Sequence, residues 1–193
     1  MRFEKGHKAA TRQHILEVAS KSFRRAGVSA AGISGIMGAA GLTNGAFYLH
    51  FASKEELVRE AVESALAERQ LDLEEKLQAG ADLEKVIRSY LSQAHREDLA
   101  CGCPSAALLP ELGRHSVPIR QTYENGLRSF VATLAALLPD ADSKSADRRA
   151  AAIFALMVGT LQLARAVPDA ARAEEILEGG VEAALVLARE SQE

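Results

Sequence analysis

Hydrophobic residues recur at the helical period along almost the whole chain, and no segment shows the strict alternation of a half-buried strand. In the first such segment, Ile15, Ala19 and Phe23 share one face. Glycine, proline or a Ser, Thr or Asp cap bounds most of the later segments. The pattern predicts an all-α protein of about nine helices, at residues 8–26, 33–40, 44–50, 54–79, 83–97, 104–113, 117–138, 145–167 and 172–190.

The second and third predicted helices are short, and a tight turn at Gly41 joins them. This arrangement is typical of a helix-turn-helix motif, whose second helix enters the major groove of DNA. Beyond it, Ser53 and Glu56 form the sequence signature of a capping box that starts a long helix. We therefore expect a three-helix DNA-binding head at residues 1–52 and a larger helical body at residues 53–193.

The segment GVSAAGISGIMGAAGLTNGAFYLHFASKEEL, from Gly27 to Leu57, resembles the N-terminal domain of the TetR family of transcription regulators. Three features carry the resemblance: a small-residue turn that ends at Gly41, the three-residue spacing of Gly45, Tyr48 and Phe51, and a Ser-Lys-Glu start of the next helix. The resemblance implies a homodimeric repressor with a helix-turn-helix head and a body that binds a ligand and a second copy of the chain.

By this resemblance, the first residues of the recognition helix would approach base edges, where an asparagine such as Asn44 can pair with adenine. Leu49 would touch a thymine methyl group, while Tyr48, His50 and Lys54 would reach phosphates and Phe47 would belong to the core. Lys8 and Arg12 would reach the DNA from the N-terminal arm. The expected DNA-binding set is Thr43, Asn44, Gly45, Tyr48, Leu49, His50, Lys54, Lys8 and Arg12.

The net charge of −3 is divided unevenly along the chain. Residues 1–54 hold eight basic and two acidic residues, a net charge of +6, and the rest holds 15 basic and 24 acidic residues, a net charge of −9. A basic head on an acidic body is expected when only the head meets phosphate, although an ordinary solvated basic helix would give the same count.

By the same resemblance, the last two helices pair with those of a second copy in a four-helix bundle, which suits a palindromic double-stranded DNA operator. Wide apolar faces agree with this, although a monomer could use them as its own core. The first face holds Ile153, Leu156, Met157, Thr160, Leu161 and Ala164, with Gly159 permitting close approach. The second holds Leu177, Val181, Ala184, Leu185, Leu187 and Ala188.

The middle helices, residues 82–138, would enclose a pocket for a small apolar or aromatic effector, with no cofactor. Each candidate lining residue could equally be plain core. The candidates are Tyr90, Leu91, His95, Leu108, Leu109, Leu112, Tyr123, Leu127 and Phe130, with Phe154 or Met157 from the following helix.

The two cysteines, Cys101 and Cys103, are too close together for an unstrained disulfide and have no zinc partners. The Gly-Cys pair at residues 102–103, before the sixth helix, resembles a subgroup of TetR regulators. A helix N-terminus favours a reactive thiol, so a repressor switched through Cys103 is an alternative to a ligand-released one.

Other function classes fit less well. No Ser/His/Asp, Cys/His or metal-ligand constellation points to an enzyme, and a sequence-neutral architectural DNA binder would have a basic surface overall. An activator would carry the same head as a repressor. The N-terminus lacks the apolar region of a signal peptide and no run of about 18 apolar residues is present, so we expect a cytoplasmic protein with no membrane span.

Overall fold

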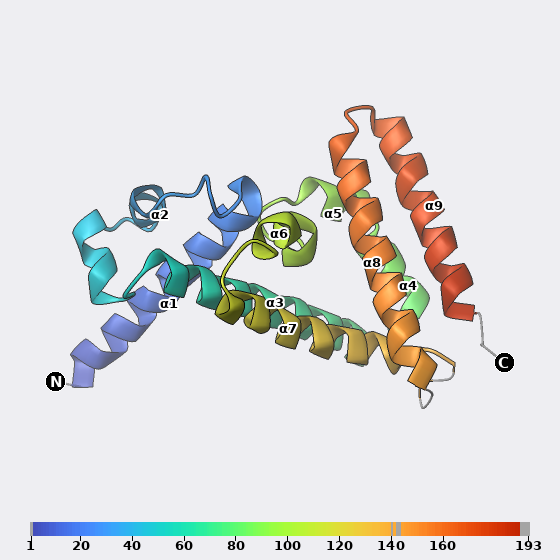
Figure 1. The fold of residues 1–193 in the computed structure, drawn as a ribbon, viewed down its shortest axis with the longest axis horizontal. Coiled ribbons are helices and arrows are strands. Elements are labelled where there is room, and N and C mark those ends of the chain that lie inside the picture. The colour runs from blue at the N-terminus through green and yellow to red at the C-terminus, as the bar shows by residue number, and fades with distance from the viewer. Residues whose placement is uncertain (1, 140, 142–143, 190–193) are drawn as a thin grey trace.

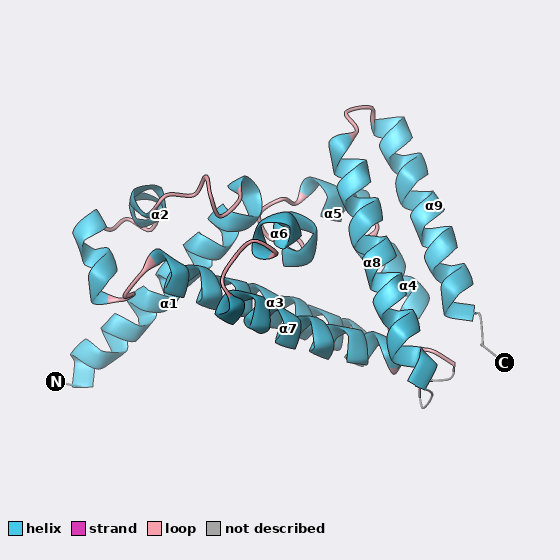
Figure 2. Ribbon diagram, in the orientation of Figure 1, coloured by secondary structure: helices cyan, strands magenta, loops and turns pink. Residues whose placement is uncertain are grey.

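The predicted all-α class is confirmed in the computed structural model, which describes residues 2–139, 141 and 144–189. Helices joined by short loops make up this part of the chain, and it contains no strand (Figure 2). The elements are α1 (Arg2–Ala26), α2 (Ile33–Ala39), the 3-10 helix η1 (Asn44–Leu49), α3 (Lys54–Gln78), α4 (Leu83–Tyr90), α5 (Gln93–Glu97), α6 (Pro104–Leu112), α7 (Val117–Ala135), α8 (Lys144–Ala166) and α9 (Ala170–Arg189).

Three elements differ from the prediction. The first helix begins at Arg2 rather than Lys8, and the third is a 3-10 helix rather than an α-helix. The helix predicted at 83–97 is two helices, because Ser92 starts α5 by accepting a hydrogen bond from the backbone N–H of His95 at 3.2 Å. A side-chain cap inside an apolar pattern ends one helix and begins another.

The turn between α2 and η1 is fixed by its backbone. The N–H of Leu42 donates to the carbonyl of Met37 at 2.8 Å, and the N–H of Gly41 donates to the carbonyl of Gly38 at 3.0 Å. These two bonds are those of a Schellman motif. Gly41 has a φ of 71°, a left-handed conformation that glycine adopts without strain. The turn therefore sets the direction in which the next segment leaves α2.

The elements form a head and a body that share α3 (Figure 1). The head combines α1, α2 and η1 at one end of the molecule, and the antiparallel pair α8 and α9 lies at the other end. Between them, α3 runs alongside α7, and α6 lies against both α1 and α8. This central position lets α6 contact the head and the body at once.

Two separate clusters of buried side chains form the core. The head cluster is built around Phe23, Met37 and Phe47, and it continues into Leu57 on α3 and Leu112 on α6. The body cluster surrounds α8. The packing of the head thus extends past residue 52, because the first turns of α3 supply one wall of its core. A division of the chain at residue 52 stays a prediction.

By length and composition alone, one helix in the described part of the chain could cross a membrane. It covers Ser145–Ala166 within α8, and its most apolar window has a mean hydropathy of 1.2. This helix packs against α6, α7 and α9, and 44% of that window is buried inside the protein. Helices in protein cores have the same composition, so packing accounts for the apolar residues of α8 that face α6, α7 and α9.

Candidate nucleic-acid interface and effector pocket

The η1 segment presents polar and apolar side chains to solvent while a phenylalanine holds it in place. Phe47 is fully buried, its ring stacks on Phe51 at a centroid distance of 5.7 Å, and Tyr48 meets it edge-on at 5.1 Å. Tyr48 and Leu49 remain 69% and 67% exposed. Four further members of the expected DNA-binding set are also exposed, namely Lys8, Thr43, Asn44 and Gly45.

The N-terminal half of α1 lies against the end of η1. The Nε of Arg12 donates to the carbonyl of His50 at 3.2 Å. Burial, followed by the positive charges of Lys8 and Arg12, lowers the pKa of His50. Lys8, Arg12 and His50, which sequence predicts as DNA-contacting residues, therefore form one cluster beside the recognition segment.

Arg12 is engaged within the protein rather than directed at solvent. Its guanidinium pairs with Glu60 at 2.6 Å and with Glu56 at 3.7 Å, and it lies 4.4 Å above the centre of the Phe51 ring. A hydrogen bond to the arginine, stronger than the opposing effect of burial, lowers the pKa of Glu60. These contacts fix α1 against α3, and DNA would have to compete with them for Arg12.

Lys54 stands at the first position of α3, where Ser53 caps the helix by accepting from the N–H of Glu56 at 3.1 Å. The Glu56 carboxylate in turn accepts from the N–H of Ala52 at 2.6 Å, which is one residue earlier than in the usual capping box. The Lys54 ammonium donates to the carbonyl of Val28 at 2.7 Å and stays half-buried. It carries two further N–H donors that a phosphate could use.

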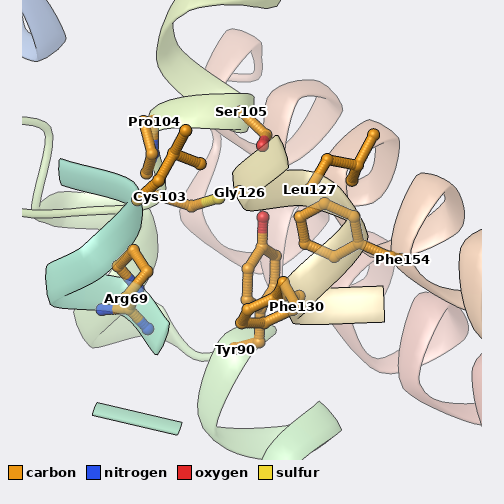
Figure 3. Close-up of a pocket in the computed structure, with 10 residues that line it drawn as sticks. Arg69, Tyr90, Cys103, Pro104, Ser105, Gly126, Leu127, Phe130 and Phe154 are labelled. Atoms are coloured by element: carbon orange, nitrogen blue, oxygen red, sulfur yellow. The ribbon is translucent and has the colours of Figure 1, made fainter. Parts of the chain in front are cut away.

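A small pocket lies in the body between α3, α4, α6, α7 and α8 (Figure 3). The space that it leaves for the centre of a water molecule is about 10 Å³, enough for about one water. In the structure described, the pocket is therefore nearly closed. Its walls are Leu66, Arg69, Tyr90, Cys103, Pro104, Ser105, Gly126, Leu127, Phe130 and Phe154.

Several expected pocket residues lie in these walls, namely Tyr90, Leu127, Phe130 and Phe154, together with Cys103. The structure places others elsewhere. Leu108 and Leu112 belong to the head cluster, and Leu91 and Met157 are buried in the body cluster. Leu109 packs partly buried against that second cluster. Sequence reasoning missed Leu66, Arg69, Pro104, Ser105 and Gly126, because nothing in the pattern of α3, α6 or α7 distinguishes a pocket wall from plain core.

Tyr123 lies next to the pocket, where its hydroxyl and that of Ser105 share a hydrogen bond of 2.9 Å. Burial, more than any other effect, raises the pKa of Tyr123. This hydroxyl therefore already has a partner.

His95 lies behind the pocket rather than in its wall. Its Nδ1 is 2.7 Å from the carbonyl of Tyr90, so this nitrogen carries the proton and donates. Its Nε2 accepts from the backbone N–H of Cys103 at 3.0 Å. Burial lowers the pKa of His95 to about 4. The neutral imidazole thus joins the end of α4 to the start of α6.

The lowered pKa of His95 predicts a stability that depends on pH. Between its ordinary pKa of 6.5 and the folded value of about 4, the unfolded chain binds a proton at His95 that the folded chain does not. The free energy of unfolding is then fully present above pH 6.5 and falls as the pH drops, by up to about 1 kcal/mol per pH unit. Urea titrations between pH 6.5 and 4.5 measure this slope.

The matched variant is His95→Gln, which can still donate to the Tyr90 carbonyl but does not titrate. We expect a shallower slope in this variant, whatever its stability at neutral pH. His50, whose pKa is also lowered, remains in both proteins and accounts for part of the slope. Equal slopes in the two proteins would contradict the role assigned to His95.

Side chains of the body hold the loop that follows α1. The Glu111 carboxylate, on α6, accepts from the N–H groups of Val28 at 3.1 Å and Ser29 at 2.8 Å. Burial alone would raise the pKa of Glu111, but these hydrogen bonds outweigh it and the pKa lies below its usual value. On the same side, buried Arg24 donates to the carbonyl of Gly102 at 3.3 Å. The last turn of α6 and the residue before its N-cap are thus tied to the head, and the first residue and N-cap of α6 line the pocket.

Comparison with known proteins agrees with this architecture. Residues 15–61 match the model of a family described as bacterial regulatory proteins of the tetR family. The HTH-type transcriptional regulator AcrR of Shigella flexneri is 42% identical over 84 residues, which are 42% of this chain and 38% of AcrR. Residues 15–61 of this chain are therefore similar to the tetR-family segment of known bacterial regulators.

Solved structures extend the likeness from this segment to the whole fold. A TetR-family regulator from Cytophaga hutchinsonii is 20% identical, with a TM-score of 0.77 over 96% of this chain and 98% of its own. The reduced form of NemR from E. coli is 24% identical, with a TM-score of 0.75 over 91% of this chain and 95% of the NemR chain. At these identities the likeness shows the fold. The match to AcrR covers less than two thirds of that protein's length.

The last two helices bury most of the side chains that sequence reasoning assigned to a partner. Met157, Leu161, Leu177 and Val181 belong to the chain's own core, and Gly180 lies against Thr160. A second stripe at helical spacing, which includes Leu156 and Gly159 of the first predicted face, is exposed or half-buried. On α8 it holds Ala152, Leu156, Gly159 and Leu163, and on α9 it holds Ile176, Gly179, Ala183 and Val186.

The two outward stripes share one side of the α8–α9 pair, because the helices are antiparallel and both stripes lie about a quarter turn from the contact between Thr160 and Gly180. Leu163 is 63% exposed and Val186 is 54% exposed. Gly159 and Gly179 face open space. This side is apolar and has room for the close approach of another helix pair.

The described residues hold no group of three or more His, Cys, Asp or Glu side chains that could bind a metal ion.

Proposed function

We propose that this chain is a sequence-specific DNA-binding regulator of the TetR family, and in particular a homodimeric repressor that a small apolar or aromatic effector releases from its operator. The observation that carries the proposal is the exposed face of η1. Asn44, Tyr48 and Leu49 point away from a segment that Phe47 anchors, inside the stretch that matches the family model.

In this proposal, the start of η1 lies in the major groove. Thr43 and Asn44 contact base edges, Gly45 allows the backbone to approach, and Leu49 touches an apolar base edge. Phosphates are bound around this centre by Tyr48, His50, Lys54 and Lys8. Arg12 contributes by fixing α1 against α3, since its guanidinium already pairs with Glu60 and Glu56.

The operator is palindromic, because two copies of the chain pair through the outward side of α8 and α9 and present two heads. The apolar stripe with Leu163 and Val186 supports this pairing, and its two glycines permit close helix packing. A protein acting on chromosomal DNA in this way works in the cytoplasm.

Effector release is proposed to run through α6. The pocket in the body is nearly closed, so a ligand has to displace its walls, among which are the N-cap and first residue of α6. Glu111 on the same helix holds the backbone N–H groups of Val28 and Ser29 in the head. A shift of α6 therefore moves the head. It favours release if the ligand binds more tightly to the arrangement that does not fit the operator.

The alternative of a thiol-switched repressor is less well supported. Cys103 is 4% exposed and Cys101, which is exposed, lies outside the pocket walls. A reactive sensor thiol is ordinarily accessible. An activator with the same head remains an open alternative, because the position of the operator relative to the promoter decides between the two.

A fluorescence anisotropy titration tests the DNA-binding proposal. The probe is the DNA flanking the gene of this protein, and a shuffled sequence of equal length is the competitor. Asn44→Ala should weaken binding by about 5- to 150-fold, which corresponds to the 1–3 kcal/mol typical of one bidentate base contact. The matched control is Gln13→Ala, which removes an exposed amide outside the expected set. Binding equal to that of shuffled DNA, or an Asn44→Ala variant that binds as wild type does, would refute the proposal.

A further inference from the structure

The hydroxyl of Tyr90 is a buried polar group with no hydrogen-bond partner in the described part of the chain. Tyr90 is 4% exposed, and its hydroxyl points toward the space between Cys103 and Ser105 (Figure 3). Buried hydroxyl groups are normally paired, and an unpaired one calls for an explanation. Burial, helped by the neighbouring Cys103, raises the pKa of Tyr90 well above its usual value. The hydroxyl therefore stays protonated and offers a hydrogen bond to whatever occupies the pocket.

The walls around this hydroxyl are aromatic. The rings of Phe130 and Phe154 lie 4.8 Å apart, and Phe154 meets the Tyr90 ring edge-on at 6.1 Å. Aromatic rings prefer partners that stack with an offset or meet edge to face. A flat ring is thus the apolar shape that these walls accommodate.

The charge at the pocket is positive. Among the described residues, Arg69 is the one charged residue in its walls, and no carboxylate lines it. The Arg69 guanidinium pairs with Asp72 at 2.9 Å and has donors left over, since a guanidinium carries five N–H groups. An anionic oxygen would be stabilised here, and a cation would be repelled.

We infer that the effector is a small aromatic carboxylate. Its ring packs against the rings of Phe130 and Phe154, one carboxylate oxygen accepts the hydrogen bond from Tyr90, and the charge faces Arg69. The inference rests on the proposed ligand-responsive function and names the ligand class for that same pocket.

Leu66 is the wall that such a ligand has to move. Its side chain lies on Gly126, where a Cβ atom would come within 2.8 Å of the Leu66 Cδ1. On the other side of these two residues, a groove between α3 and α7 holds about 340 Å³ of free space. Rotation of Leu66 into the groove enlarges the closed pocket enough for a single ring. Glycine at position 126 leaves the room for this leucine that any larger residue would take.

Three ligands of nearly equal shape test the charge of the effector: benzoate, benzamide and benzamidinium. Isothermal titration calorimetry with the full-length protein, without DNA, should show the tightest binding for benzoate, weaker binding for benzamide and no binding for benzamidinium. Tyr90→Phe should weaken benzoate binding by at least about tenfold, as loss of a hydrogen bond to a charged group does. Arg69→Gln should remove the preference for benzoate over benzamide.

Thr133→Val is the matched control, because it removes a hydroxyl on α7 that already has partners and that lies outside the pocket walls. It should leave benzoate binding unchanged, and melting temperatures confirm that each variant is folded. No binding of benzoate at millimolar concentration, tighter binding of benzamidinium, or wild-type benzoate affinity in Tyr90→Phe would each overturn the inference.

Operator binding, measured separately, distinguishes this inference from the function on which it rests. If operator binding is specific but the benzoate series fails, the ligand class is wrong and the DNA-binding function stands. If the benzoate series behaves as expected but no operator is bound, the pocket is assigned correctly and the regulatory function is not.

Discussion

Replacing Leu163 by glutamate should dissociate the proposed homodimer and lower the affinity for a two-site operator by about 10² to 10⁴-fold, the gain that linking two binding modules provides. Leu163 lies in the outward stripe of α8 and is 63% exposed. In a two-fold interface each substitution occurs twice, so the variant would bury two carboxylates among apolar side chains. Charges buried without partners cost several kcal/mol each.

Leu71→Glu is the control, since Leu71 on α3 is 58% exposed but lies outside the stripe. Sedimentation velocity should show monomers for Leu163→Glu and dimers for wild type and Leu71→Glu, with a matching loss of operator affinity in the first variant alone. A Leu163→Glu protein that sediments as the wild type does would mean that the chains pair through another surface. Monomeric wild-type protein would remove the dimer from the proposal.

Local signals made the head predictable from sequence. Gly41 has the positive φ of a helix end, Ser53 caps α3, and Pro104 opens α6, all as expected from the residue types. Each signal acts within a few residues, and backbone hydrogen bonds respond to it directly. The same reasoning put Phe47 in the core and left its neighbours exposed.

The side of α8 and α9 that we propose faces a partner could not be predicted in this way. Both helices carry one apolar stripe that packs inside the chain and another that faces outward, and hydrophobic spacing is the same for both. Sequence reasoning therefore assigned Met157 and Leu161 to a partner, whereas they are fully buried within one chain. Only the tertiary position of Thr160 against Gly180 separates the two sides.

The pocket was predicted in part for a similar reason. Tyr90 and Phe130 were expected because they lie in the middle helices, whereas Arg69 comes from a helix whose polar pattern looks like an ordinary solvated face. His95 was expected to touch a ligand and instead bonds the carbonyl of Tyr90 and the N–H of Cys103. Such bonds join residues of different elements, which periodicity along the chain does not record.

Adjacent aromatic residues of η1 should give opposite results when each is replaced by alanine. Phe47→Ala should lower the free energy of unfolding by about 3–5 kcal/mol, because it leaves a cavity under a fully buried ring. Because the free energy of unfolding of a whole domain is about 5–15 kcal/mol, this loss would remove a large part of the stability of the head. Tyr48→Ala removes a ring that is 69% exposed and should change stability little while it weakens operator binding.

The expected contrast follows from how η1 is held. It is a 3-10 helix of six residues whose N-cap, Thr43, makes no side-chain capping bond. So short a helix has little stability of its own, and its order depends on packing. Denaturant titration and anisotropy on both variants measure the two effects. Equal losses of stability would mean that Tyr48 is also part of the core and does not belong to the DNA-binding set. A Phe47→Ala protein as stable as the wild type would mean that α2 and its Schellman turn alone fix the recognition segment.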